Sequence, residues 1–205
     1  MKLIGLLLLF GNMMLAQSVQ IKKISCDTIL PEKGYSVSLK YDASNESWDE
    51  TIPNILFTFS HDENENEKII YHEELFSQFK NVEFEDFNGD GVKDILVENI
   101  SDVRSNLTYN LFLVDLKNEK LIKIEGFNEI KNPNYLSKYN LIDCMVMSGR
   151  NWTSFYKIEN NKIKDFGYTI KMGEDENVRE YDYDGTYKKS FKENFKKSDK
   201  KQHKR

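Results

Sequence analysis

The chain alternates apolar and polar residues with a period of two, and this pattern constrains its fold more than any other feature. In "YSVSLKYD" the apolar positions are Tyr35, Val37, Leu39 and Tyr41. Successive side chains of a β-strand point to opposite faces of its sheet, so the pattern predicts a half-buried strand. The segment "NILFTFS" repeats it. Convincing helical stripes are absent, and we therefore expect a mostly β fold.

Paired strand patterns predict antiparallel hairpins. "NILFTFS" is followed by the acidic run "HDENENEK" and then by "IIYHEELF", which indicates a hairpin with a long acidic turn. "KNEK" joins "TYNLFLVDL" to "LIKIEGF", and "ENNK" joins "SFYKI" to "IKDFGYTI". These two short connections predict two further hairpins. An aromatic content of 13% and the presence of only three prolines favour sheets.

The N-terminus has the features of a signal peptide. It reads "MKLIGLLLLFGNMMLAQS", with Lys2 ahead of an apolar run from Leu3 to Phe10. A permanent membrane anchor needs about 20 apolar residues, so this run is too short to be one. We expect residues 1 to 16 to be cleaved after Ala16 and the protein to be exported, either periplasmic or secreted. The alternative is an uncleaved apolar N-terminus.

The remaining chain is long enough for one domain or two small ones. We expect a β domain over residues 17 to 187, in which N-terminal strands occupy residues 18 to 75 and a second part residues 76 to 187. Residues 188 to 205, "KKSFKENFKKSDKKQHKR", contain nine Lys and Arg residues against Glu193 and Asp199. We interpret this segment as a basic flexible tail.

Two cysteines, Cys26 and Cys144, remain after cleavage. An oxidising compartment would favour a disulfide between them. Closing so long a loop would stabilise the fold by about 4 to 5 kcal/mol in the chain-entropy model. Two buried free thiols are the equally acceptable alternative.

The stretch "EDFNGDGVKDIL" contains a pattern of oxygen donors typical of calcium loops. Its D-x-N-x-D-G-x-x-D register is formed by Asp86, Asn88, Asp90, Gly91, Val92 and Asp94. Alternate side chains of a tightly wound loop converge on one point, and the glycine lets the Val92 carbonyl face inward. Hard oxygen donors suit calcium rather than zinc. The alternative is a metal-free turn stabilised by the same aspartates.

An EF-hand would place a glutamate at position 12 of this loop, but that position is Val97, inside the strand-like run "DILVEN". The segment instead resembles the calcium loop of FG-GAP/VCBS β-propeller repeats. A bacterial envelope family is similar to this chain in the order of three later segments, "YNLFLVDLKNEKLIKI", "NPNYL" and "SGRNWTSFYKIENNKI". The family includes a periplasmic immunity protein against a peptidoglycan hydrolase, and its fold resembles that of lysozyme inhibitors. The resemblance covers residues 80 to 170 and implies an incomplete propeller-like fold with one calcium loop.

A second acidic stretch, "EYDYDGTYK", has Glu180, Asp182, Asp184 and Gly185 in a similar register. Lys188 stands where an acidic ligand would be needed. A cation there opposes calcium binding, so we interpret this stretch as an acidic turn.

The stretch "SGRNWTSFY" is the strongest candidate for partner binding. Ser148, Gly149 and Asn151 favour a turn, while Arg150 and Trp152 are residue types enriched at binding hot spots. Lysozyme inhibitors insert Ser-Gly loops into the enzyme cleft, which is what the resemblance implies here. The alternative is a Trp152 packed into the core beside an ordinary turn.

No common catalytic motif accompanies the three histidines of the chain. We therefore expect a calcium-binding protein without enzymatic activity that binds a protein in the cell envelope, with a peptidoglycan hydrolase as the specific candidate. We expect no nucleic-acid partner and no transmembrane anchor. The alternatives are an adhesion or surface-assembly component that inhibits nothing, and a hydrolase with an unidentified carboxylate pair.

Overall fold

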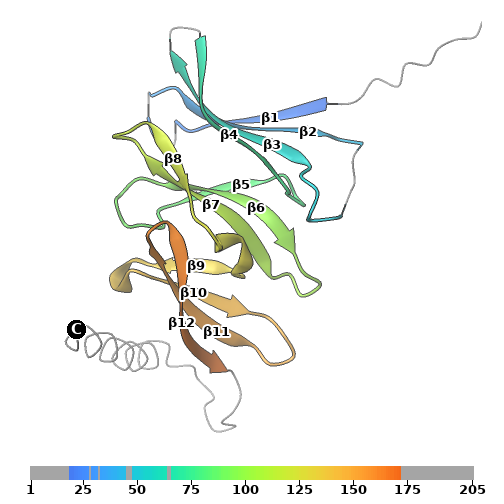
Figure 1. Cartoon of the computed structure of the whole chain (residues 1–205), viewed down its shortest axis with the longest axis vertical. Coiled ribbons are helices and arrows are strands. Elements are labelled where there is room, and N and C mark those ends of the chain that lie inside the picture. Colours follow the sequence, from blue (N-terminus) through green and yellow to red (C-terminus); the bar gives the residue numbers. More distant parts are fainter. Residues whose placement is uncertain (1–18, 28, 32, 45–47, 64–65, 172–205) are drawn as a thin grey trace, which may run out of the picture.

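The computed structural model of the chain describes residues 19–27, 29–31, 33–44, 48–63 and 66–171 (Figure 1). The predicted signal peptide, the acidic stretch at residues 180 to 188 and the basic tail lie outside these residues. The described part consists of strands with two short 3-10 helices, which confirms the expectation of a mostly β fold. It contains no helix long and apolar enough to cross a membrane.

The strands form three four-stranded antiparallel sheets, each an up-and-down meander of consecutive strands. The first sheet contains β1 (Val19–Ser25), β2 (Tyr35–Asp42), β3 (Ile55–Glu63) and β4 (Asn66–Leu75). The second contains β5 (Val82–Glu85), β6 (Asp94–Ser101), β7 (Leu107–Asp115) and β8 (Lys120–Lys123). The third contains β9 (Pro133–Leu136), β10 (Leu141–Val146), β11 (Trp152–Glu159) and β12 (Lys162–Lys171). The helices η1 (Phe127–Glu129) and η2 (Ser137–Tyr139) flank β9.

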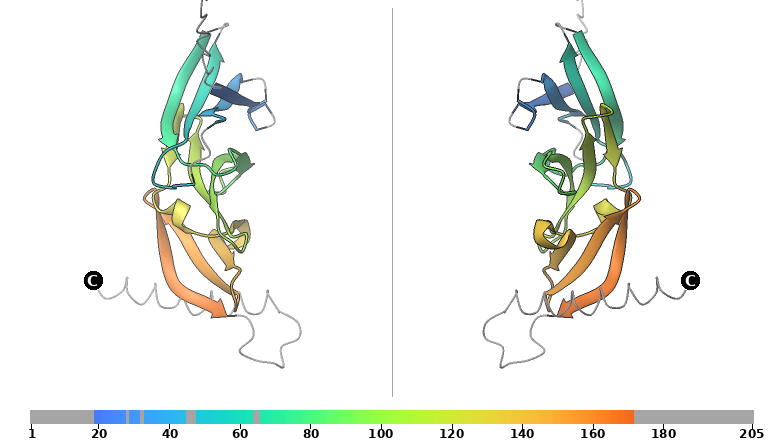
Figure 2. Two further views of the ribbon diagram at one scale, coloured as in Figure 1. Left: turned by 90° about the vertical axis from the view of Figure 1, so that its right-hand side faces the viewer. Right: turned by 90° about the vertical axis from the view of Figure 1, so that its left-hand side faces the viewer.

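The three sheets follow one another along the long axis of the molecule in chain order (Figures 1 and 2). Four-stranded meanders are also the blades of β-propellers, where they surround a central channel. Here the described strands form three open sheets, and neither a closed barrel nor the expected propeller-like arrangement is found among them.

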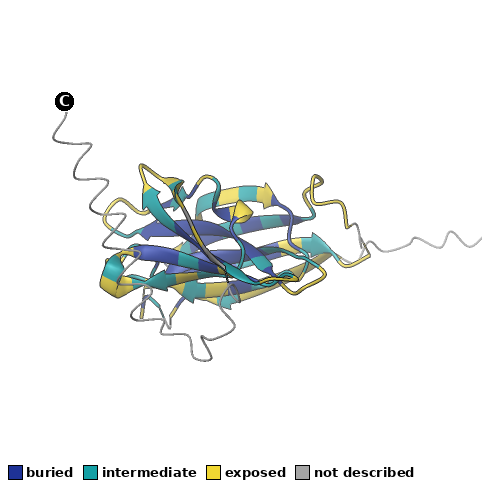
Figure 3. Cartoon of the chain, turned by 90° about the horizontal axis from the view of Figure 1, so that it is seen from below, coloured by how far each residue is buried: buried dark blue, intermediate teal, exposed yellow. Residues whose placement is uncertain are grey.

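The second sheet separates two cores, and residues on both of its faces are buried. Figure 3 shows that buried residues gather in the middle of the strands, while exposed ones lie at strand ends and connections. Alternate residues of β6 and β7 belong to different cores: Phe112 and Val114 pack with the first sheet, whereas Leu111 and Leu113 pack with the third. The sequence of a strand that is covered on both faces is a nearly continuous run of apolar residues. This explains why "DILV" and "NLFLV" lack the clean alternation of "YSVSLKYD".

The predicted hairpins form, with one correction. Asp115 pairs with Lys120 and Glu159 with Lys162, so both short connections are tight turns. The expected long acidic turn is wrong, because β3 and β4 remain paired up to Glu63 and Asn66. The acidic residues extend the ladder on an exposed part of the sheet, where Lys68 lies 3.8 Å from Glu63 and 3.0 Å from Glu119.

Cys26 and Cys144 are free thiols in the structure, so the predicted disulfide is not formed. The physical reason is their position: Cys26 packs in the core of the first and second sheets, and Cys144 in the core of the second and third. The second sheet lies between these cores. The alternative of two buried thiols describes the structure, and burial raises the pKa of the Cys26 thiol to about 11.

Candidate calcium loop and partner-binding hairpin

The predicted calcium loop connects β5 to β6. Asp86 organises its first turn, since its Oδ1 accepts hydrogen bonds from the amides of Asn88 (3.2 Å) and Gly89 (2.6 Å). Its Oδ2 accepts one from the amide of Gly91 at 2.9 Å. Gly89 and Gly91 have φ angles of 75° and 85°, in the left-handed region that glycine enters without strain. The two glycines therefore permit the tight winding expected from the sequence.

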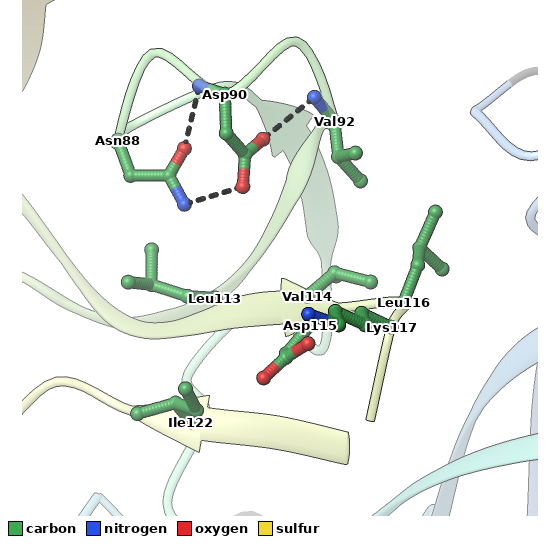
Figure 4. A pocket seen from close by; sticks show the side chains of 9 residues that line it. All are labelled: Asn88, Asp90, Val92, Leu113, Val114, Asp115, Leu116, Lys117 and Ile122. Carbon is green, nitrogen blue, oxygen red and sulfur yellow. Dashed lines mark hydrogen bonds between the residues drawn. The ribbon is translucent and has the colours of Figure 1, made fainter. Parts of the chain in front are cut away.

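Asn88 and Asp90 continue this pattern along the loop (Figure 4). The Asn88 Oδ1 accepts the amide of Asp90 at 2.9 Å, and the Asp90 Oδ1 accepts the amide of Val92 at 2.8 Å. The Asn88 amide group also donates to the Asp90 carboxylate at 2.9 Å. These are Asx-type turns, in which each side-chain oxygen binds the backbone two residues later.

Asp94 attaches the end of the loop to the core. It is fully buried, its Oδ2 accepts the amide of Phe87 at 2.9 Å, and its Oδ1 accepts the amide of Val114 at 3.0 Å. Burial raises the pKa of the Asp94 carboxyl to about 7; its two hydrogen bonds oppose the shift, and Asp90 and Asp86 add to it. One carboxylate thus joins the loop to β6 and to β7.

The loop has the donors for a hard cation. Three carboxylates and an amide oxygen lie within nine residues. Asp86 Oδ1 accepts two backbone amides, whereas each of the other carboxylate oxygens accepts one hydrogen bond and keeps a second lone pair. Within the described part of the chain, however, no three Asp, Glu, His or Cys side chains gather closely enough to hold a metal ion. The donor chemistry fits calcium. To converge on one ion, the side chains would have to turn away from the backbone amides that they now accept.

A cavity of about 380 Å³ lies between this loop and the β7–β8 hairpin (Figure 4). Asn88 and Asp90 face it from the loop, and Leu113, Asp115 and Ile122 face it from the hairpin. On the other side, the loop lies against the third sheet, where the aromatic rings of Phe87 and Tyr135 are 6.0 Å apart. The loop is therefore wedged between the second and third sheets.

The predicted partner-binding stretch forms the connection between β10 and β11. Val146 pairs with Trp152, so the loop consists of residues 147 to 151 and Trp152 is the first residue of β11. The loop closes on itself: the Ser148 amide donates to the Asn151 side chain at 3.0 Å, and the Ser148 hydroxyl donates to the Arg150 carbonyl. Arg150 is exposed, and Trp152 is half-buried. The turn expected from Ser148, Gly149 and Asn151 is present.

Asn106, in the connection between β6 and β7, attaches this loop to the second sheet. Its side chain is buried, and its amide group donates to the Met147 carbonyl at 2.9 Å. Its Oδ1 accepts the Met147 amide at 2.7 Å and the Asn132 side-chain amide at 2.9 Å. Asn132 in turn donates to the Met145 carbonyl at 2.8 Å and accepts the Leu107 amide at 2.8 Å. Two asparagines thus link three chain segments.

Asp102 completes the network. Its carboxylate accepts hydrogen bonds from the Asn106 side chain at 3.0 and 2.9 Å and from the ammonium group of Lys131 at 2.7 Å. The Lys131 hydrogen bond is the largest cause that holds the pKa of the Asp102 carboxyl far below its ordinary value. We define the Asn106 network as Asp102, Asn106, Lys131 and Asn132.

This network was not predicted from the sequence. Its members lie up to 41 residues from their partners, and asparagine is common in turns, so no local spacing singles them out. The two sites that were predicted lie apart: the β5–β6 loop is on the left of the molecule and the β10–β11 loop on the right (Figure 1).

No family model matches the sequence, and no curated protein matches it. Among solved structures, the chain is similar to one described as "Structure of a Xanthomonas Type IV Secretion System related protein", with 15% sequence identity and a TM-score of 0.42. The alignment covers 76% of this chain and 88% of that chain. Identity and score are both too low to carry a functional argument.

Proposed function

We propose that this is an exported, calcium-binding, non-enzymatic β protein that binds another protein in the cell envelope through the β10–β11 hairpin. The observation that carries the proposal is the anchoring of an exposed loop by a buried side chain: Asn106 bonds both backbone groups of Met147. Binding costs less free energy when the contacting loop is already ordered. The arrangement therefore supports a recognition role for residues 148 to 152.

The specific form of the proposal is inhibition of a peptidoglycan hydrolase, with Ser148, Gly149, Arg150, Asn151 and Trp152 entering the enzyme cleft. It is tested by adding the full mature chain to a muramidase and to a peptidoglycan amidase acting on purified sacculi. Arg150→Ala and Trp152→Ala should relieve inhibition. Lys117→Ala, an exposed cation in the β7–β8 turn, is the matched control and should inhibit fully.

The alternative is a calcium-stabilised adhesion or surface-assembly component. It predicts binding to a glycan or surface protein with no inhibition of any hydrolase. If the wild-type chain inhibits no hydrolase but is retained on intact sacculi, this alternative replaces the inhibitor proposal. Turnover of peptidoglycan by the chain alone would contradict both forms.

We further propose that Asp86, Asn88, Asp90, Asp94 and the Val92 carbonyl hold the calcium ion. The ion would neutralise three carboxylates. Burial is the main cause that raises the pKa of Asp94, and the charges of Asp90 and Asp86 add to it. At free calcium about 100-fold above the dissociation constant, binding would stabilise the fold by about 2.7 kcal/mol.

Thermal unfolding in calcium and in chelator tests the metal site. Calcium should raise the melting temperature of the wild-type chain, and Asp90→Ala should abolish the rise. Lys93→Ala, within the same loop but without a donor oxygen, should keep it. Equal melting temperatures of the wild-type chain in calcium and chelator would reduce the loop to a metal-free turn.

A further inference from the structure

The β6–β7 loop lies beside the β10–β11 loop and has no assigned role. It consists of residues 102 to 106, between the ends of β6 and β7. Both loops emerge on the right of Figure 1, on the side of the molecule opposite the β5–β6 loop. Asn106 belongs to the first loop and bonds directly to Met147 of the second, so the two loops are held as one unit.

This unit presents an unusual set of side chains. Val103 is completely exposed, at 101% of its reference area, and Arg104 beside it is also exposed. In the part of the chain that the structure describes, the only arginines are Arg104 and Arg150, one in each loop. Neither guanidinium takes part in an ion pair among those residues.

The local charge is positive on a chain whose net charge is -5. Asp102 is the one acidic residue of the two loops, and Lys131 already neutralises it at 2.7 Å. The two arginines therefore remain available to an external anion. Arginine presents a planar fork of donors that fits carboxylates in two-pronged contacts.

We propose that the β6–β7 loop and the β10–β11 loop form one composite surface that binds a protein partner through its carboxylates. This inference deepens the proposed function and rests on it, because it adds Val103 and Arg104 to the surface and defines the partner as acidic. A protein is favoured over a glycan or a membrane because Arg, Trp and an exposed apolar residue are typical of protein interfaces. The loops themselves contain no lysine, the residue that is depleted at such interfaces.

Site-specific photo-crosslinking in the full chain tests the composite surface. A photoreactive phenylalanine is placed at Val103 in one variant and at Gly149 in another. Both positions tolerate it, since Val103 is fully exposed and a Cβ at Gly149 would meet no atom within 4 Å. Lys117 is the control position, because it lies in the β7–β8 turn, which is on the left of Figure 1. We expect positions 103 and 149 to trap the same acidic protein in cells, and position 117 not to trap it.

The charge requirement is tested in the same system. Arg104→Glu, introduced into the variant that carries the photoreactive residue at position 149, should lower the adduct yield at least about fivefold, because it replaces an ion pair with a repulsion. Lys117→Glu should leave the yield unchanged. An unaffected yield with Arg104→Glu would overturn the acidic-partner inference.

The crosslinking pattern separates the two proposals. An adduct from position 149 but not from 103 would overturn the composite surface while supporting the hairpin as a binding site. No adduct from either position would contradict both. Adducts with lipid or glycan in place of protein would overturn the choice of partner.

Discussion

At the scale of single residues, Asn106 has the largest structural consequence for the proposed binding surface. It uses its amide oxygen and its amide nitrogen to bond the Met147 backbone across 41 positions of the chain. A buried polar group left without its partner costs about 1–3 kcal/mol. Asn106 therefore contributes to both the stability and the orientation of the hairpin, together with Asn132, which bonds the Met145 carbonyl.

Asn106→Ala should lower the free energy of unfolding by about 2–3 kcal/mol, because it leaves both backbone groups of Met147 and the Asp102 carboxylate short of a partner. Urea denaturation of the full chain measures the change. Asn118→Ala is the matched control: Asn118 is exposed and bonds only to Asp115 within its own turn. If both variants lose the same small amount, the Asn106 network does not stabilise the fold.

Asp94 predicts a dependence of stability on pH. Burial raises its folded-state pKa to about 7, well above the ordinary value of an aspartate carboxyl, so the folded state binds the proton more tightly than the unfolded state. Protonation of Asp94 therefore contributes to the free energy of unfolding. This contribution is at most about 4 kcal/mol; it is fully present below about pH 4 and is lost as the pH rises to about 7.

The comparison of wild type with Asp94→Asn isolates this contribution. In chelator, the unfolding free energy of the wild type should be larger than that of the variant. This difference should be larger at pH 4 than at pH 7.5. Asn also directs an N–H group at one of the two amides that Asp94 accepts, so the variant should be less stable throughout. A gap that widens with rising pH in chelator would contradict the raised pKa.

At the scale of elements, the β5–β6 loop is fitted against β9 at Gly89. A Cβ built at Gly89 would lie 2.9 Å from the Tyr135 hydroxyl, whereas one at Gly91 would meet nothing within 4 Å. Both glycines have positive φ. Two glycines of the same loop thus differ only in their neighbour.

Gly89→Ala should therefore destabilise the chain more than Gly91→Ala. Each substitution carries the backbone cost of a left-handed residue, about 1–2 kcal/mol, and Gly89→Ala adds the collision with Tyr135. Repeating Gly89→Ala in a Tyr135→Phe background should remove the excess, since the hydroxyl is then absent. Urea denaturation in chelator of the wild type, the three single variants and the double variant provides the free energies. Equal costs for the two glycines would show that the loop does not press against β9.

An element could be predicted from the sequence when the residues that determine it lie close together in the chain. The hairpins β7–β8 and β11–β12 were predictable because their turns and alternation lie within a few residues. The division into three stacked sheets was not, since it depends on which face of β6 and β7 meets which neighbour. The β5–β6 turn was visible in the sequence through Gly89 and Gly91, but its contact with Tyr135 involves a residue 46 positions away.

At the scale of the whole molecule, the second sheet couples the other two. Phe112 of β7 stacks on Phe57 of β3 with ring centroids 4.7 Å apart, while its neighbour Leu111 is buried in the opposite core. Damage to either core should loosen β7 and so weaken the other. The stack is therefore expected to unfold as one cooperative unit.

Phe112→Ala tests this coupling. Removing a buried phenylalanine should cost about 3–5 kcal/mol, from lost burial and the remaining cavity. Hydrogen exchange followed by peptide mass spectrometry should show faster exchange in β3 and equally in β10, although the buried residues of β10 belong to the opposite core from Phe112. Phe79→Ala, an exposed phenylalanine of the β4–β5 connection, should change neither. If β10 keeps its wild-type protection while β3 loses it, the three sheets unfold separately and the expected coupling through β7 is wrong.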